Sequence, residues 1–174
     1  VQDEINNKLD EMAENGTLAE IVTAYITKKL KVHYIRESGA CYVVELPNGK
    51  NLLFDTGLAE SWANIQTAIE GLGITKFDYA VISHTHADHT GNIQNFINNF
   101  DMTGCIWYIG MKPDFTNHAD DFGEPESWYD DTIDLLQTNG ITPIVPSDNV
   151  VINIDSLYDV DFRFLNTDPV KAES

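Results

Sequence analysis

The chain has 174 residues, of which 43% are hydrophobic and 10% aromatic, which is enough for one globular domain with a core of its own. Its 28 acidic and 10 basic residues give a formal net charge of −18 at pH 7, which disfavours generic binding to the phosphate backbone of nucleic acids. No apolar run approaches the roughly 20 residues that a membrane span needs, so no membrane partner is expected.

Residues 3–26 are predicted to be helical, because their apolar side chains recur every three or four positions. The Asn15-Gly16-Thr17 stretch divides this pattern into two helices. Two helices separated by Asn-Gly resemble the closing helices of bacterial extracellular solute-binding proteins, and this resemblance favours an extracytoplasmic location. The alternative is an added helical hairpin. We therefore predict an N-terminal helical segment at residues 1–28 and leave the compartment open.

Residues 29–174 alternate predicted strands and helices, which is typical of an α/β domain. Strands are expected at residues 30–36, 40–46 and 50–54, followed by a helix at 60–72, a strand at 78–83 and a helix at 90–99. A strand at 103–109, a helix at 127–138 and two short strands at 150–154 and 159–165 complete the order.

The cysteines and tryptophans are predicted to belong to the core of this domain. Cys41 and Cys105 fall inside apolar strand-like runs, so we expect two buried free thiols. Trp62, Trp107 and Trp128 are interpreted as core anchors in preference to a platform for substrate.

Three of the five histidines and one aspartate lie together after the strand predicted at 78–83. His84 and His86 are two positions apart, so in an extended segment their rings point to the same side, and Asp88 and His89 follow where the chain turns. Neutral imidazole and carboxylate groups are ligands for zinc, and manganese and iron accept them too. The alternative is a polar loop with a chance cluster of histidines. The pattern favours a metal site.

The His-x-His-x-Asp-His pattern of these four residues, together with the Asp55-Thr56-Gly57 segment upstream of it, resembles the signature of the metallo-β-lactamase superfamily. The segment at residues 39–50 is similar to the opening hairpin of the branch that includes the soluble domain of the DNA-uptake competence channel protein. The resemblance implies an αββα sandwich. It also implies a metal-dependent hydrolase that cleaves a phosphodiester or another ester, with a β-lactam the least expected substrate.

The resemblance assigns a role to each site residue. His84 and His86 bind a first metal ion, and Asp88 and His89 bind a second, so one or two zinc ions are expected, with manganese or iron as substitutes. Metal binding lowers the pKa of water from about 15.7 to about 7, and Asp88 would be the catalytic residue that orients the resulting hydroxide or carries its proton. Asp55 would not bind the metal itself but would hold the metal loop in place through hydrogen bonds. The alternative for Asp55 is a cap of the following helix.

A further histidine normally completes the shell of the first metal in this family. His118 is the candidate for this position, and an exposed loop histidine is the alternative interpretation. His33, in an early predicted strand, is interpreted as a surface histidine or one satisfied by a neighbour.

The family resemblance also implies a second half of the sandwich, whose strands would follow residues 162–168 and bring another aspartate and another histidine that this sequence does not supply. We therefore predict only the N-terminal half of the domain, with Val43, Leu53 and Val81 on a sheet face that a second copy, further chain or the N-terminal helices would cover. Two functions remain open. One is a hydrolase of a small-molecule or ester substrate, and the other is a non-catalytic half-domain with a partial or vacant metal site that acts through association.

Overall fold

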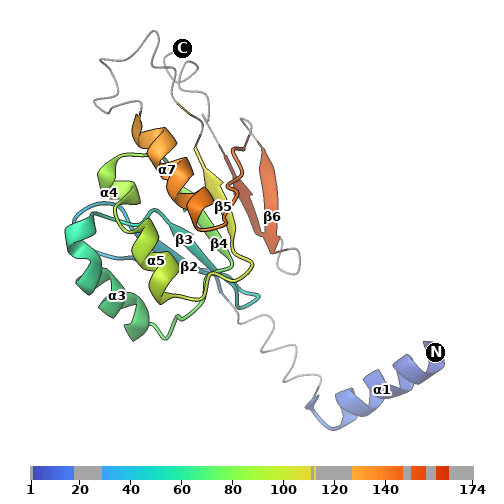
Figure 1. Ribbon diagram of the computed structural model, residues 1–174. Helices are drawn as coiled ribbons and strands as arrows, with labels where there is room; N and C mark the ends of the chain where they lie inside the picture. Colours follow the sequence, from blue (N-terminus) through green and yellow to red (C-terminus); the bar gives the residue numbers. More distant parts are fainter. Residues whose placement is uncertain are drawn as a thin grey trace, which may run out of the picture. The chain divides into compact units, whose positions relative to one another are not determined.

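A computed structural model describes residues 2–17, 29–110, 112, 127–146, 150–155 and 160–164 (Figure 1). The chain divides into two compact units, Val1–Leu30 and Lys31–Ser174. In the first unit, α1 (Gln2–Glu14) has Asp3 and Glu4 in its first turn, where negative charge stabilises the amino end of a helix. The second helix predicted for this segment lies mostly outside the described residues. No helix in the described part of the chain is long and apolar enough to cross a membrane.

The second unit is built on a five-stranded sheet with the order β1-β2-β3-β4-β5. Its strands are β1 (Lys31–Tyr34), β2 (Tyr42–Glu45), β3 (Asn51–Phe54), β4 (Tyr79–Ile82) and β5 (Ile106–Ile109). The first three are antiparallel, whereas β3, β4 and β5 are parallel, because helical connections return the chain to the same end of the sheet. All four residues of β4 are buried, as its uninterrupted apolar sequence predicts.

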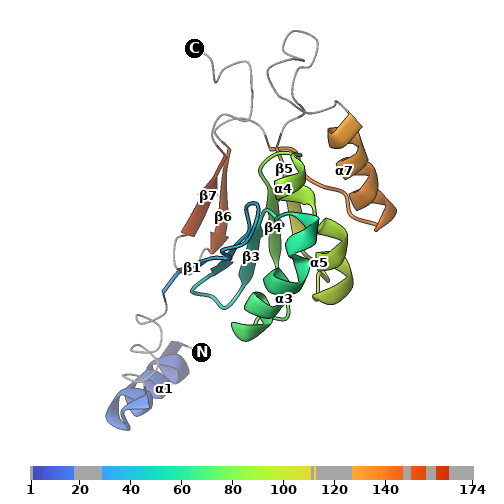
Figure 2. The ribbon, with the colours of Figure 1, turned by 90° about the vertical axis from the view of Figure 1, so that its left-hand side faces the viewer.

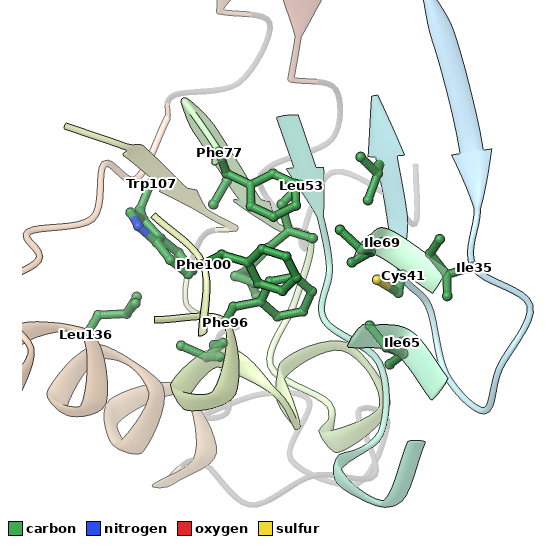
Figure 3. Packing of buried hydrophobic residues seen from close by; sticks show 14 of the residues in the cluster. Ile35, Cys41, Leu53, Ile65, Ile69, Phe77, Phe96, Phe100, Trp107 and Leu136 are labelled. Carbon is green, nitrogen blue, oxygen red and sulfur yellow. The ribbon is translucent and has the colours of Figure 1, made fainter. Parts of the chain in front are cut away.

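Helices cover one face of this sheet (Figures 1 and 2). They are η1 (Ala59–Ser61), α3 (Trp62–Gly71), α4 (Ala87–Thr90), α5 (Ile93–Asn99) and α7 (Ser127–Thr138). The main core lies beneath them, where Ile65, Ile69, Phe96 and Leu136 from the helices pack with Leu53 from the sheet (Figure 3). The α/β order is therefore confirmed, although the helix predicted at 90–99 begins later, as α5 at Ile93, and the short helix α4 forms before it within the histidine segment.

A two-stranded antiparallel sheet, β6 (Val151–Asp155) and β7 (Val160–Arg163), lies against the opposite face (Figure 2). Its Ile154, together with Phe164, joins a second core that includes Val81. The expectation of one uncovered face is therefore wrong at the three residues named for it. Val43 and Leu53 are 0% exposed under the helices, and Val81 is 3% exposed under the β6–β7 hairpin. Leu53 is paired with Ala80, so Val81, the next residue, points to the opposite face.

The predicted core residues differ in their outcome. Cys41 is buried, Cys105 is half-buried, both are free, and burial raises the pKa of each thiol to about 12. Trp107 is buried, and Trp62 packs edge-on against the aromatic core. The interpretation of Trp128 as a core anchor is wrong, because its side chain is 36% exposed at the start of α7.

Candidate metal centre

The candidate site lies at the carboxyl ends of the parallel neighbours β3 and β4. Asp55 follows β3 and Ser83 follows β4, so the sheet itself brings the two residues together. The Ser83 backbone N–H donates to Asp55 Oδ1 at 2.7 Å, and the Ser83 hydroxyl donates to Asp55 Oδ2 at 2.8 Å. Asp55 is 1% exposed and has a φ of 56°, a conformation that costs a non-glycine residue energy and that these hydrogen bonds help to hold.

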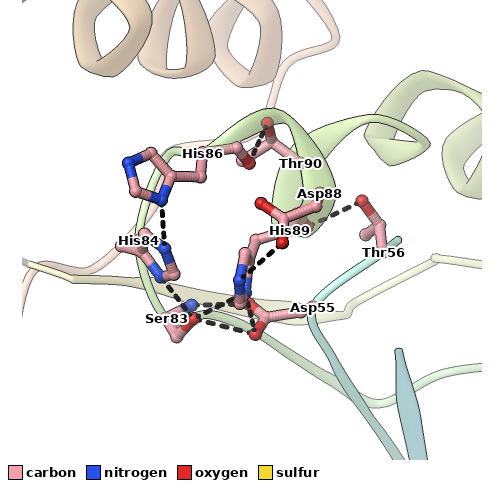
Figure 4. Close-up of polar contacts among 8 residues, drawn as sticks. All are labelled: Asp55, Thr56, Ser83, His84, His86, Asp88, His89 and Thr90. Atoms are coloured by element: carbon pink, nitrogen blue, oxygen red, sulfur yellow. Dashed lines mark hydrogen bonds and ion pairs between the residues drawn. The ribbon is translucent and has the colours of Figure 1, made fainter. Parts of the chain in front are cut away.

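The four residues predicted as metal ligands converge in the histidine loop, residues 83–90 (Figure 4). The His84 ring centroid lies 4.6 Å from that of His86 and 3.9 Å from that of His89. His84 Nε2 is 2.9 Å from His86 Nδ1, and His89 Nε2 is 3.5 Å from Asp88 Oδ2. The donor atoms therefore form two pairs, a His84–His86 pair and an Asp88–His89 pair.

Local hydrogen bonds explain this convergence. His86 is extended and precedes α4, and its carbonyl accepts hydrogen bonds from the backbone N–H groups of His89 and Thr90 at 2.9 Å and 3.1 Å. The single helical turn that results reverses the direction of the chain, so that His89 lies next to His84 instead of extending away from it.

Asp55 and Thr56 connect β3 to this turn. Asp55 Oδ2 lies 2.7 Å from His89 Nδ1, while the backbone N–H and the hydroxyl of Thr56 donate to the His89 carbonyl at 2.7 Å and 2.9 Å. The alternative prediction, that Asp55 caps the following helix, is wrong, because Leu58 occupies the N-cap of η1. Asp55 contacts the ring nitrogen of His89 that faces away from Asp88.

Burial perturbs two titratable groups in the site. It raises the pKa of the Asp55 carboxyl, although hydrogen bonds from Ser83 and His89 act in the opposite direction. Burial, together with the nearby His89 and His86 rings, lowers the pKa of His84 to about 4. His84 is therefore neutral at physiological pH, which is the form that binds a metal ion.

A family model described as the metallo-beta-lactamase superfamily matches residues 34–167. The chain belongs to the metallo-β-lactamase superfamily. Members of this superfamily are generally metal-dependent hydrolases. The comparison with curated proteins gave no match.

Several solved structures are similar to part of this chain. The metallo-β-lactamase GOB-18 from Elizabethkingia meningoseptica is 22% identical, with a TM-score of 0.47 over 74% of this chain and 46% of that one. A putative metallo-β-lactamase from Thermotoga maritima is 14% identical, with a TM-score of 0.48 over 71% and 61%. The class B3 di-zinc metallo-β-lactamase LRA-12 from an Alaskan soil metagenome is 23% identical, with a TM-score of 0.42 over 74% and 47%.

The chain spans about half the length of most of the superfamily structures that it matches, with 46% of one and 47% of another covered. These comparisons address the superfamily as a whole. The resemblance to the competence channel branch stays a prediction, as do the likeness of residues 1–28 to solute-binding proteins and the location that it suggests.

The donor set suits a divalent cation of the kind that this superfamily uses. The 2.9 Å between His84 Nε2 and His86 Nδ1 is close to the roughly 3.3 Å that separates two nitrogens in a tetrahedral zinc site with Zn–N bonds of about 2.0 Å. Each pair supplies two donors, however, and within the described residues no group of three or more His, Cys, Asp or Glu side chains is arranged to hold a metal ion by itself. Each pair therefore needs further ligands.

The two remaining histidines do not supply such a ligand among the described residues. His118 lies outside the described residues. His33 lies on β1, where its Nε2 is 2.8 Å from Glu45 Oε1, so it is a histidine satisfied by a neighbour, as predicted.

Sequence reasoning missed three residues that hold the histidine loop in place. Ser83 contacts Asp55, His84 and His89. Asn92 is fully buried, and its side-chain amide donates hydrogen bonds to the carbonyls of Thr56 and Leu58. Gly39 has a φ of 87°, and its Cα lies so close to the Asp88 carbonyl that a side chain there would overlap it. An isolated Ser, Asn or Gly forms no periodic pattern. The sequence therefore marked Gly39 only as the start of the 39–50 segment, and Ser83 and Asn92 only as neighbours of the histidine motif.

Proposed function

We propose that this chain carries the metal-binding loop of a hydrolase that cleaves a phosphodiester or another ester. The observation that carries the proposal is the arrangement of the donor atoms in two adjacent pairs on one loop, with a buried carboxylate behind them. A divalent cation bound there, zinc or else manganese or iron, would supply Lewis-acid activation of water near neutral pH.

The residues of the chain have distinct tasks in this proposal. His84 and His86 would hold one cation through their ring nitrogens, and His89 and Asp88 would hold the adjacent one. The Asp88 side chain is 46% exposed, so its carboxylate can also reach an attacking water and accept its proton. Asp55, buried behind His89, keeps the His89 Nε2 atom directed at the site.

The substrate class rests on the opening hairpin of the domain. Residues 39–50 are similar to the start of the competence channel branch, which supports a phosphodiester over a β-lactam. The strongly acidic composition argues against a long nucleic acid as the substrate and supports a small-molecule ester.

Calorimetric zinc titration of the wild type and of two matched histidine variants tests the metal site. His86→Ala removes one donor of the first pair, and we expect zinc affinity to fall at least about tenfold. His33→Gln removes a histidine outside the site and should leave zinc binding unchanged. Equal zinc affinity in both variants would contradict the proposal. Because each pair has two donors, binding to this chain should be weaker than in a full di-zinc domain.

Hydrolysis of bis(p-nitrophenyl) phosphate tests the reaction. It is measured for the zinc-loaded chain and for a chain extended by any residues that follow Ser174 in its gene. Zinc-dependent release of p-nitrophenol that the Asp88→Asn variant loses is the expected result. Hydrolysis that persists after chelation of the metal would overturn the assignment.

A second function, association through the sheet edge, is favoured by a specific observation. Among the described residues β1 pairs with β2 alone, and its Val32 and Tyr34 side chains are 60% and 54% exposed. An open strand edge with apolar side chains is a pairing surface. Sedimentation should show dimers that Val32→Lys dissociates, whereas a wild-type chain that stays monomeric at high concentration would exclude self-association.

A further inference from the structure

We infer that Ser83 is a positioning residue whose hydroxyl connects the Asp55 carboxylate to His84, so that one buried carboxylate orients a histidine of each metal pair. The identity of the two pairs rests on the proposed function. The positions of the hydrogen atoms follow from the contacts of Ser83 and Asp55 and do not depend on that function.

The Ser83 hydroxyl lies at the centre of a compact polar cluster (Figure 4). Its Oγ atom is 2.8 Å from Asp55 Oδ2, 3.0 Å from His84 Nδ1 and 3.2 Å from His89 Nδ1. A hydroxyl has one hydrogen to donate and two lone pairs with which to accept. When the Asp55 carboxylate is ionised it has no hydrogen, so the hydrogen between Oγ and Oδ2 then belongs to Ser83. The remaining contact with His84 then requires a hydrogen on His84 Nδ1.

The same reasoning applies to His89, whose Nδ1 lies 2.7 Å from Asp55 Oδ2 and must donate to it. Both rings therefore carry their hydrogen on Nδ1 and their lone pair on Nε2, and in the metal-free chain the His84 Nε2 accepts a hydrogen bond from His86 Nδ1 at 2.9 Å. His84 Nε2 faces His86, and His89 Nε2 faces Asp88, so the two lone pairs point into the two metal positions. Asp55 sets the His89 tautomer directly and the His84 tautomer through Ser83.

This role can be separated from folding. The backbone N–H of Ser83 donates to Asp55 Oδ1 at 2.7 Å, and this bond does not need the side chain. Ser83 is exposed, so removal of its hydroxyl leaves no cavity in the core. A Ser83→Ala variant should keep the fold and lose the connection to His84, and Ser83→Thr should restore it.

Long-range ¹H–¹⁵N NMR of the metal-free chain with labelled histidine, at pH 8, reads the tautomers directly. In the wild type we expect the Nδ1–H form for both His84 and His89. In Ser83→Ala, His84 should change to a mixture or to the Nε2–H form, while His89 stays as it is, and Ser83→Thr should resemble the wild type. An Nε2–H form of His84 in the wild type, or a His84 signal that Ser83→Ala leaves unchanged, would overturn the inference.

Zinc titration of the same proteins distinguishes the inference from the proposed function. Loss of such a supporting hydrogen bond typically lowers metal affinity about 10- to 100-fold, and this is the expected effect of Ser83→Ala, with recovery in Ser83→Thr. If the tautomers behave as expected and the wild type binds no zinc, the positioning role stands and the hydrolase assignment fails. If zinc binds equally well to wild type and Ser83→Ala with unchanged tautomers, the hydrolase assignment stands and the positioning role fails.

Discussion

Replacement of Asn92 by Ala should destabilise the protein, because this side chain connects the α4–α5 junction to the loop behind Asp55. Asn92 is 0% exposed. Its side-chain amide donates to the carbonyls of Thr56 at 2.9 Å and Leu58 at 2.7 Å, and its side-chain oxygen accepts from Asn95 at 2.9 Å. In Asn92→Ala the two carbonyls keep their positions and lose this donor.

The magnitude follows from the surroundings of each carbonyl. Thr56 is fully buried, and a buried acceptor left without a donor costs about 1–3 kcal/mol. The Leu58 carbonyl still accepts from the Ser61 backbone N–H at 3.0 Å, so its loss is an ordinary hydrogen bond of about 0.5–1.5 kcal/mol. We therefore expect the free energy of unfolding to fall by about 1.5–4.5 kcal/mol.

Urea unfolding of the metal-free chain, followed by circular dichroism, measures this change. Asn99→Ala is the matched control, because Asn99 lies at the end of the same helix and is exposed, and its substitution should change stability by less than about 0.5 kcal/mol. Asn92→Asp retains the size of the side chain but presents oxygen to both carbonyls, so it should be at least as damaging. A loss below about 1 kcal/mol in Asn92→Ala would refute the assignment of these hydrogen bonds as stabilising contacts.

Gly39→Ala should lower the free energy of unfolding by more than about 2 kcal/mol, because the φ of Gly39 is 87° and an added Cβ would overlap the Asp88 carbonyl. A calorimetric scan measures this change, and an unchanged melting temperature would show that the two loops can separate. The metal-free chain should lose stability as pH falls from 6.5 toward 4, because the unfolded chain binds a proton at His84 in this window and the folded chain, with a pKa of about 4, does not. Denaturant titrations at several pH values should give a flatter profile for His84→Gln, and identical profiles would count against this cause. Ellman's reagent at pH 8 should react slowly with Cys41 and Cys105 in the native chain and rapidly in denaturant, because burial raises the pKa of both thiols to about 12. A fast reaction of the native chain would contradict their burial.

Local pattern in the sequence was sufficient wherever a segment interacts mainly with itself. The helix predicted at 127–138 matches α7, Ser127–Thr138, because its apolar spacing and the Gly140 that follows it define both ends. The apolar run of β4 predicted a buried strand, and the two-residue spacing of His84 and His86 predicted rings on one side. The histidine motif with Asp55 also sufficed to indicate the superfamily.

Only the tertiary structure decided which segments meet. Ser83 and Asp55 are far apart in the chain, and they come into contact because β3 and β4 are parallel neighbours in the register that pairs Phe54 with Val81. The same register determines that Leu53 and Val81 lie on opposite faces, which no single-strand pattern reveals for strands that are apolar on both sides. The contribution of Ser83 to the site could not be read from the chain, because a serine hydroxyl acquires its role from the three polar groups that the fold places around it.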